Sequence, residues 1–377
     1  MMAMIQKQLH RTIALLGLLA GLSLLVALFT RLLGAQSAGA ANEFYDSHFH
    51  LTNYVQQGIT PREFLQIMGT RVGRSTLFGI PLQQQWSYGN SGGFAPTYYL
   101  HSDAPLYYYS FTDAYIASVY KALTPAEQAR FDPMITGFNP ADMYGVDHIR
   151  RVLQVFPGVF TGIGEFSIHK EFVSAKVSGE TASLTNPALD RILDFAAETG
   201  LVVILHNDID MPFAKADTEP VYLTQMKALL RRHTNASIIW AHTGLGRIVH
   251  PTQVSAEGAE RSPNHVEIVE AMLSDSTLSH LNFDISWDEV AKYAVSSPAV
   301  VARVAALLNK YPDRFLFGTD TVAPASAAAY FSVFDMWGPV WRQLTPETSL
   351  KVRKGNYERI FNDGRRRVRA WERANLK

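Results

Sequence analysis

The chain has 377 residues, of which 47% are hydrophobic and 18% are charged, an ordinary composition for a globular protein with a large core. Lys and Arg together number 34, as do Asp and Glu, so no net basic charge points to nucleic acid as a partner. The lack of cysteine excludes disulfides and thiolate ligands, so any metal must be bound by His, Asp, Glu or other oxygen ligands.

The N-terminal segment has the features of an export signal. Basic residues precede an apolar run over residues 13–29, small residues follow it, and residues 38–40 match an A-x-A cleavage site. The run is also near the lower length of a spanning helix, so an uncleaved membrane anchor is the alternative. Either way we expect residues 1–41 to lie outside the fold. Residues 42–377 would form one domain that is periplasmic, secreted or anchored to the membrane.

Beyond this segment, short apolar or β-branched runs alternate with amphipathic stretches. Most of the runs are too apolar to have one face in water, which is typical of strands in a parallel sheet. The candidate strands, in chain order, are Phe44–His50, Ser75–Pro81, Asp132–Phe138, Val159–Phe166, Leu201–His206, Ser237–His242, Leu281–Ser286 and Arg314–Thr319.

Helix signals lie between these strands. Thr60-Pro61 with Glu63 is typical of a capped helix start, and Asn186-Pro187 opens a helix that Gly200 ends. Similar apolar spacing predicts helices over Leu223–His233, His265–Ser274, Pro298–Tyr311 and Pro346–Phe361.

This repeated strand–helix alternation predicts an α/β fold, a closed (β/α)8 TIM barrel. An open doubly wound sheet is the alternative, but no G-x-G-x-x-G follows the first strand, which weighs against a dinucleotide site. After the second strand we expect a long aromatic-rich insertion over residues 82–111, which either forms a wall of the pocket or packs as an inert cap.

Residues of metal-binding type stand where five of these strands end. Two histidines two positions apart in one strand point to the same face. Singly, each residue would be explained as a hydrogen-bonded cap of a strand, but six at the same end of one barrel indicate a metal site, because buried charges need partners. They are His48, His50, Glu165, His206, His242 and Asp320.

This order of ligands resembles the amidohydrolase superfamily over about residues 43–362, and the closing segment 355–361, GNYERIF, is typical of its amidohydrolase-related branch. The resemblance implies a metal-dependent hydrolase with one or two divalent ions per chain, Zn²⁺ being the expected metal. By that resemblance His48, His50 and Asp320 hold the more buried ion and His206 and His242 hold the second. The resemblance also implies that Glu165, which stands where many members have a carboxylated lysine, would bridge the two ions if both are present.

The expected reaction is cleavage of an ester, amide, lactone or phosphoester bond of a small molecule by an activated water, with Asp320 transferring the proton. One alternative is a mononuclear decarboxylase of an aromatic or enoic acid, in which Glu165 serves a different role. A non-catalytic barrel that only binds its ligand is the other.

Several residues near the predicted ligands are candidates for contact with substrate or ligands. His169, Lys170, Arg247 and Trp287 are the candidate substrate contacts, although each is equally well explained as a loop, rim or pocket residue. Asn207 and Asp208 are candidates to orient His206, and Asp284 is expected to be structural. The remaining histidines fit no ligand position. The sequence is also compatible with a homo-oligomer.

Overall fold

The computed structural model describes residues 42–93, 102–179, 182–211, 219–246 and 263–376. Contacts divide the chain into two units, residues 1–42 and residues 43–377, and the fold lies in the second. The predicted export segment lies outside the described residues.

Within the described residues, one sheet of eight parallel strands follows the chain order, with short strands of other pairs between them. These strands are β1 (Phe44–Asp46), β3 (Val72–Leu77), β6 (Phe131–Ile135), β7 (Gly162–Ser167), β8 (Val202–His206), β9 (Ser237–Trp240), β10 (Asn282–Asp284) and β11 (Phe315–Leu316).

The residues that directly follow the first and last strands of this sheet are joined by a backbone hydrogen bond. The Ser47 N–H donates to the Phe317 carbonyl over 3.0 Å. Beyond that point β2 (Phe49–His50) pairs in parallel with β12 (Thr321–Val322). The predicted fold class is therefore confirmed as an α/β fold of TIM-barrel type.

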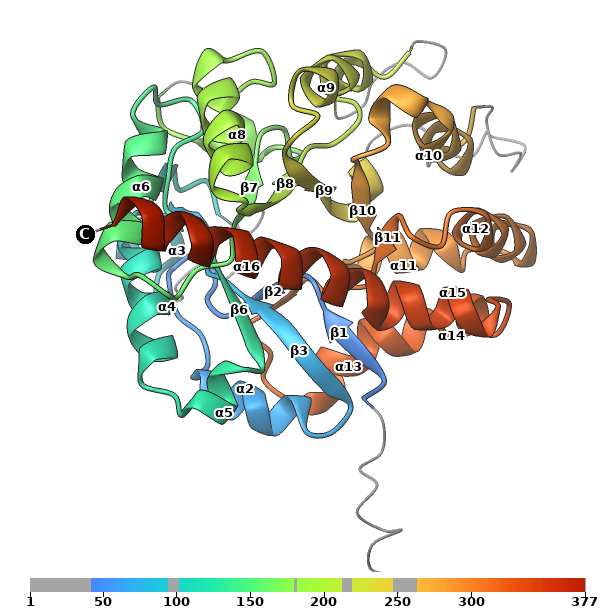
Figure 1. Ribbon diagram of the computed structural model, residues 1–377, viewed down its shortest axis with the longest axis horizontal. Coiled ribbons are helices and arrows are strands. Elements are labelled where there is room, and N and C mark those ends of the chain that lie inside the picture. The colour runs from blue at the N-terminus through green and yellow to red at the C-terminus, as the bar shows by residue number, and fades with distance from the viewer. Residues whose placement is uncertain (1–41, 94–101, 180–181, 212–218, 247–262, 377) are drawn as a thin grey trace, which may run out of the picture. The chain divides into compact units, whose positions relative to one another are not determined.

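Helices connect the strands, and in Figure 1 most of them surround the strands on the outside. They are α2 (Pro61–Met68), α3 (Tyr88–Ser91), α4 (Phe111–Lys121), α5 (Pro125–Gln128), α6 (Gly145–Val155), α7 (Val173–Lys176), α8 (Pro187–Thr199), α9 (Val221–Arg232), α10 (His265–Ser274), α11 (Asp288–Ala294), α12 (Pro298–Lys310), α13 (Ala327–Met336), α14 (Gly338–Trp341), α15 (Pro346–Leu350) and α16 (Asn356–Asn375).

The predicted helix starts are confirmed. Thr60 and Glu63 form a reciprocal capping box at α2, the Asn186 side chain accepts from the Ala188 N–H at α8, and Gly200 ends α8 in the left-handed conformation. The last predicted helix is different: α15 and α16 are separated by a π-helical turn at residues 351–355. Helix α16 also continues past the predicted end, because its buried face extends to Val368 and Glu372.

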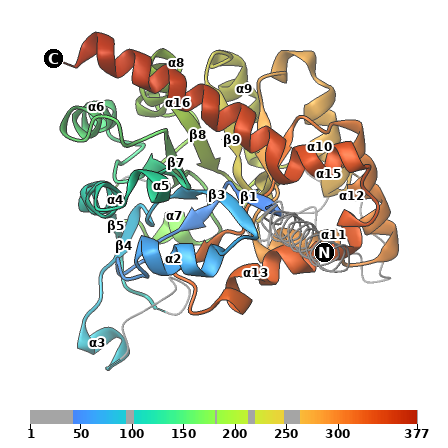
Figure 2. The same cartoon turned by 60° about the horizontal axis from the view of Figure 1, so that its bottom comes forward.

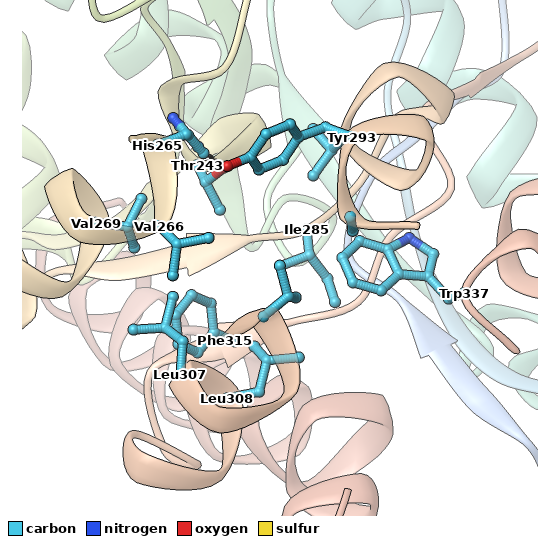
Figure 3. Close-up of a pocket in the computed structure, with 13 residues that line it drawn as sticks. Thr243, His265, Val266, Val269, Ile285, Tyr293, Leu307, Leu308, Phe315 and Trp337 are labelled. Carbon is cyan, nitrogen blue, oxygen red and sulfur yellow. Dashed lines mark hydrogen bonds between the residues drawn. The ribbon is translucent and has the colours of Figure 1, made fainter. Parts of the chain in front are cut away.

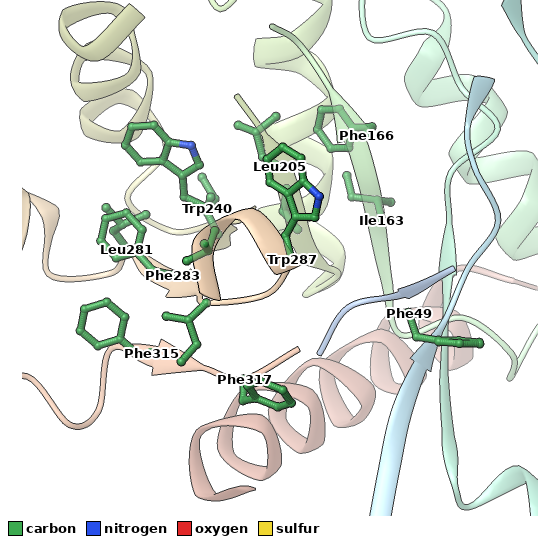
Figure 4. Close-up of a cluster of buried hydrophobic side chains, with 14 of the residues drawn as sticks. Phe49, Ile163, Phe166, Leu205, Trp240, Leu281, Phe283, Trp287, Phe315 and Phe317 are labelled. Carbon is green, nitrogen blue, oxygen red and sulfur yellow. The ribbon is translucent and has the colours of Figure 1, made fainter. Parts of the chain in front are cut away.

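The side chains of β8 alternate between the two faces of the sheet. Val202 and Ile204 belong to a cluster inside the barrel, whereas Val203 and Leu205 belong to the larger cluster between strands and helices. The period of two therefore directs His206 to the inside. Figure 4 shows part of the outer cluster, in which Trp240, Phe283 and Phe315 follow one another across neighbouring strands.

Helix α16 closes the amino-terminal end of the strands, and Figure 1 shows it crossing in front of them. Its Tyr357 and Phe361 enter the interior cluster, and the Tyr357 hydroxyl donates to Asp132 over 2.8 Å. Arg365 also pairs with Asp132, at 2.6 Å. Of the three consecutive arginines at residues 365–367, Arg365 is thus anchored by a buried carboxylate, whereas Arg366 is exposed.

The insertion after β3 contains β4 (Leu82–Gln84), α3 and β5 (Leu106–Tyr108), with β4 and β5 antiparallel. It lies beside α4 and projects away from α16 (Figure 2). Leu82 and Leu106 pack with Tyr54, Ile80 and Val173 in a small cluster of their own. Residues 94–101 of the insertion lie outside the described residues, so its role as pocket wall or cap stays a prediction.

Among the residues that the structure describes, no single helix is long and apolar enough to cross a membrane. The consecutive helices α11 and α12 are together long and apolar enough, but the chain bends by 109° between them.

Candidate metal centre

The six predicted ligands converge where the strands end at their carboxyl edges. His48 and His50 direct their Nε2 atoms at the same carboxylate oxygen, Oδ1 of Asp320, over 3.3 Å and 3.1 Å. This common direction is what their spacing of two residues predicts. His242 Nε2 lies 3.9 Å from the other oxygen of Asp320.

Glu165 lies between two groups of these residues. Its Oε2 atom lies 3.6 Å from His48 Nε2 and 3.3 Å from His50 Nε2. Its Oε1 atom lies 2.6 Å from His206 Nδ1 and 3.4 Å from His242 Nε2. We call His48, His50 and Asp320 the first half-site, and His206 and His242 the second half-site.

A bulge in β7 turns Glu165 into the barrel. Ile163 and Phe166 both pack in the outer cluster, and the register between β7 and β8 shifts between them. Strict alternation would instead place Glu165 on the outer side with Ile163. Gly164 adopts a φ of 110°, and a Cβ there would lie 2.1 Å from the Ile204 carbonyl oxygen, so only glycine fits the bulge.

His242 reaches the site through a break in the strand pattern. Strand β9 ends at Trp240, two residues before its predicted end, and a 3-10 turn covers Ala241–Gly244. Within this turn His242 and Thr243 have φ values of 56° and 55°, a region that side-chain-bearing residues rarely adopt. Asp320, at 53°, shares this conformation. Such backbone outliers concentrate at functional sites.

Each of the four histidines contacts an oxygen outside the cluster with its other ring nitrogen. His48 Nδ1 lies 2.9 Å from Asp284 and His50 Nδ1 lies 3.2 Å from the Gly79 carbonyl. His206 Nε2 lies 3.0 Å from Asp208, as predicted for an orienting carboxylate. Such partners fix the orientation and tautomer of metal-binding imidazoles.

Two residues contact the predicted ligands although the sequence did not predict such a role for them. Asp284 contacts His48 directly, although it was expected to be structural in role. Ser286, whose Oγ lies 2.9 Å from His242 Nδ1, was not singled out at all. The available signal was their spacing of two at the end of β10, which directs both side chains to one face. Asn207 does not orient His206, because its amide donates to the Asp208 carbonyl instead.

The donor set fits a divalent cation. Imidazole nitrogens and carboxylate oxygens of these residues form groups whose ligand atoms lie within 4.8 Å of one another. His48 Nε2 and His242 Nε2 are buried and have no hydrogen-bond partner among the described residues. A buried polar atom without a partner is costly, and divalent ions bound by the two half-sites would satisfy these nitrogens.

The charges of the site favour ionised carboxylates. Burial alone would raise the pKa of Glu165, but Lys170 and His206 hold it well below its ordinary value. Burial opposes ionisation of Asp320 as well, yet His242, His48 and His50 lower its pKa. Both carboxylates are therefore available as anionic ligands at neutral pH.

Two of the candidate substrate contacts lie at this site. Lys170 Nζ is 3.6 Å from Glu165 Oε1 and 6.0 Å from the ring centre of Trp287. The Trp287 ring centre is in turn 5.1 Å from that of His242. His169 instead stacks on Tyr222 at 3.7 Å, and burial lowers its pKa to about 4.

The remaining histidine and arginine predictions differ in outcome. Arg247 lies outside the described residues, as do His101 and His250. His148 and His233 pair with carboxylates, and His280 is half-buried. His265, on α10, is buried and contacts Thr243 Oγ1 at 2.8 Å.

A small apolar cavity lies beside His265. Figure 3 shows His265 and Thr243 at one side of it and Trp337 at the other. Its volume of about 30 Å³ has room for water rather than for a substrate. The cavity therefore belongs to the packing behind the His242 turn.

Comparisons with known proteins agree with this arrangement. A family model described as amidohydrolase matches residues 45–362. No curated protein matches the chain. An uncharacterized TIM-barrel protein from Bordetella bronchiseptica is similar in structure, with 13% identity, a TM-score of 0.50, and coverage of 85% of this chain and 99% of that one.

Two further solved structures are similar at lower scores. Dihydroorotase from Campylobacter jejuni is 11% identical with a TM-score of 0.47, covering 85% of this chain and 84% of that one. A 2,6-dihydroxybenzoate decarboxylase from Rhizobium is 12% identical with a TM-score of 0.46, covering 85% of this chain and 99% of that one.

Proposed function

Because the chain belongs to the amidohydrolase family, we propose that it is a metal-dependent hydrolase that uses an activated water to cleave an ester, amide, lactone or phosphoester bond of a small molecule. The family resemblance expected from the sequence is confirmed by this membership. The choice of hydrolysis, and of a site for two ions, is the proposal.

The observation that carries the proposal is the position of the Glu165 carboxylate. One oxygen faces His48 and His50, and the other faces His206 and His242. A carboxylate oriented in this way can be shared by two cations, and paired ions suit hydrolysis. His48, His50 and Asp320 would hold one ion, and the second half-site would hold the other.

A divalent ion held by these residues would supply a water whose pKa is lowered from about 15.7 to about 7 and a charge that polarises an oxygen of the substrate. Asp320 would take the proton of the attacking water as general base and return it to the leaving group. Its lowered pKa keeps it ionised before reaction, as that role requires. Both of its oxygens lie beside ring nitrogens of the cluster, so it is held at the reacting centre.

Substrate contacts would come from the loops around the cluster. Trp287 offers an aromatic surface next to His242, and Lys170 offers a cation for an anionic substrate group. His169 is a weaker candidate, because its ring is stacked on Tyr222. Arg247 is retained as a candidate clamp for a carboxylate or phosphate.

One observation favours the mononuclear decarboxylase as a second candidate. The Lys170 ammonium lies 3.6 Å from Glu165 Oε1, the oxygen that would face the second ion. A cation at this distance repels a divalent ion and lowers the affinity of the second half-site. If the second half-site stays empty, Glu165 would contact Lys170 and the substrate rather than bridge two metal ions.

The deciding experiment measures metal content and turnover of the purified full-length chain. We expect two Zn²⁺ per chain, hydrolysis within a panel of esters, lactones, amides and phosphoesters, and loss of the second ion in Glu165→Gln. One ion, with release of carbon dioxide from an aromatic or enoic acid, would replace hydrolysis by decarboxylation. A chain that binds no added Zn²⁺ would overturn both and indicate a non-catalytic barrel.

Export and zinc preference belong to the proposal as well. The apolar run over residues 13–29 supports export or anchoring, and the His and carboxylate donors suit Zn²⁺. Fractionation of expressing cells, with detection of the mature N-terminus, tests the first. Competition between Zn²⁺, Mn²⁺ and Co²⁺ tests the second.

A further inference from the structure

Asp284, the last residue of β10, contacts His48 of the first half-site through the ring nitrogen that faces away from Glu165 and Asp320. Its Oδ2 atom is 2.9 Å from His48 Nδ1, and both side chains are fully buried. An ionised carboxylate only accepts hydrogen bonds, so Asp284 holds a proton on His48 Nδ1. Nε2, which faces Asp320 and Glu165, is then the ring nitrogen that can offer its lone pair to a metal ion.

The other oxygen of Asp284 is connected to the second half-site. Oδ1 accepts from the His242 backbone N–H over 2.8 Å and from the Ser286 backbone N–H over 3.2 Å. It also accepts a short hydrogen bond from the Ser286 hydroxyl. Ser286 Oγ is in turn 2.9 Å from His242 Nδ1.

The direction of these hydrogen bonds follows from the number of protons available. The Ser286 hydroxyl has one proton, and it is donated to Asp284. The hydroxyl oxygen must therefore accept from His242 Nδ1–H, which leaves the Nε2 lone pair of His242 facing Glu165. His48 Nε2 and His242 Nε2 are also the two cluster nitrogens that have no hydrogen-bond partner among the described residues.

We propose that Asp284 and Ser286 form a positioning pair that fixes the metal-binding tautomer of one histidine in each half-site, directly for His48 and through the serine hydroxyl for His242. This inference rests on the proposed metal-dependent function. It makes a single carboxylate responsible for preparing two ion sites.

The positioning pair makes Asp284→Asn and Ser286→Ala differ in a defined way. In Asp284→Asn the amide oxygen takes the place of Oδ1, because the two backbone N–H groups and the hydroxyl all point there. The amide NH2 group then faces His48 Nδ1 and moves the ring proton to Nε2, which cannot bind a cation. His242 keeps its tautomer in this variant.

Ser286→Ala affects His242 and leaves His48 unchanged. His242 Nδ1 loses its acceptor, so the ring can place its proton on Nε2 and donate to Glu165 Oε1 instead. The contact between Asp284 and His48 is unchanged. Loss of such supporting partners lowers metal affinity about 10- to 100-fold.

The test is a calorimetric Zn²⁺ titration, with a competing chelator, of the full-length chain and its variants. We expect one of two sites to weaken about 10- to 100-fold in Asp284→Asn and the other in Ser286→Ala, with both weakened in the double variant. Ser286→Thr, which keeps the hydroxyl, should restore near wild-type affinity. Asp313→Asn, an exposed carboxylate that pairs with Lys351, is the matched control. Circular dichroism and thermal melts check that each variant is folded.

The outcomes separate the inference from its premise. A wild-type chain that binds no Zn²⁺ overturns the proposed function. A wild-type chain that binds Zn²⁺ while both single variants retain its affinities overturns the positioning pair alone. Weak binding in Asp284→Asn with normal binding in Ser286→Ala also overturns it, because the serine link to His242 would then have no effect on metal binding. If Asp284→Asn is unfolded, Ser286→Ala and Ser286→Thr decide the matter.

Discussion

Replacement of Lys170 by methionine should lower the stability of the metal-free chain and raise its affinity for Zn²⁺. The side chain keeps its length but loses the ammonium that lies 3.6 Å from Glu165 Oε1, where only 11% of the lysine side chain and 2% of the glutamate are exposed. At an effective dielectric constant of about 20, the attraction over 3.6 Å is about 4–5 kcal/mol. The histidines around Glu165 make up for part of this lost attraction, so we expect the free energy of unfolding of the metal-free chain to fall by roughly 3 kcal/mol.

With a divalent ion on Glu165, the same ammonium becomes a neighbour of like charge. Its removal should then strengthen Zn²⁺ binding about tenfold, or about 1.4 kcal/mol. A lower stability of the metal-free chain together with a higher affinity for Zn²⁺ would show that Lys170 acts through its charge. A general loss of packing would instead lower both the stability and the affinity.

The assays are urea unfolding of the chelator-treated full-length chain and calorimetric Zn²⁺ titration. Lys292→Met is the control, because this lysine is 52% exposed beside Asp288 and Glu289 and its loss should cost less than about 1 kcal/mol. A stability loss under about 0.5 kcal/mol in Lys170→Met, or weaker Zn²⁺ binding, would refute the reasoning.

Three further changes test the site and its support. Asp320→Asn should reduce hydrolytic turnover by about 10²- to 10⁴-fold with an unchanged circular dichroism spectrum, and near-full activity would exclude Asp320 as the general base. Tyr357→Phe removes a donor to the buried Asp132 and should lower the free energy of unfolding by about 1.5–3 kcal/mol, whereas Tyr107→Phe, at an exposed position, should leave it unchanged in urea melts. Burial lowers the pKa of His265 to about 3, so its contribution to stability is present above about pH 6.5 and is lost as the pH falls toward 3. Between about pH 6.5 and pH 4, the free energy of unfolding should therefore fall by about 3 kcal/mol more in the wild type than in His265→Gln. The same fall in both proteins would contradict this.

Local patterns in the sequence were sufficient for the order of elements. Apolar runs define parallel strands because both of their faces are buried, and the caps at Thr60 and Asn186 define helix starts because the capping contacts are local. The spacing of His48 and His50 sets their common direction for the same reason.

The tertiary structure decided how the remaining ligands enter the site. Alternation alone would direct Glu165 outward, and the bulge at Gly164 turns it inward. His242 follows an inward-facing Ala241 and reaches the cluster only through its left-handed backbone. Neither feature is a local preference of these residues, because both are held by hydrogen bonds and packing from neighbouring strands.

By itself, then, the sequence determined the fold class, the family and the set of residues that could bind a metal. Only the tertiary structure decided that Glu165 lies between two groups of histidines, that Lys170 competes for one of its oxygens, and that Asp284 and Ser286 support His48 and His242. Except for the contact of Lys170, which follows Glu165 in the same part of the chain, the physical reason is distance along the sequence. The other contacts join residues of different strands, and hydrogen-bond direction and charge balance appear only when the strands are side by side.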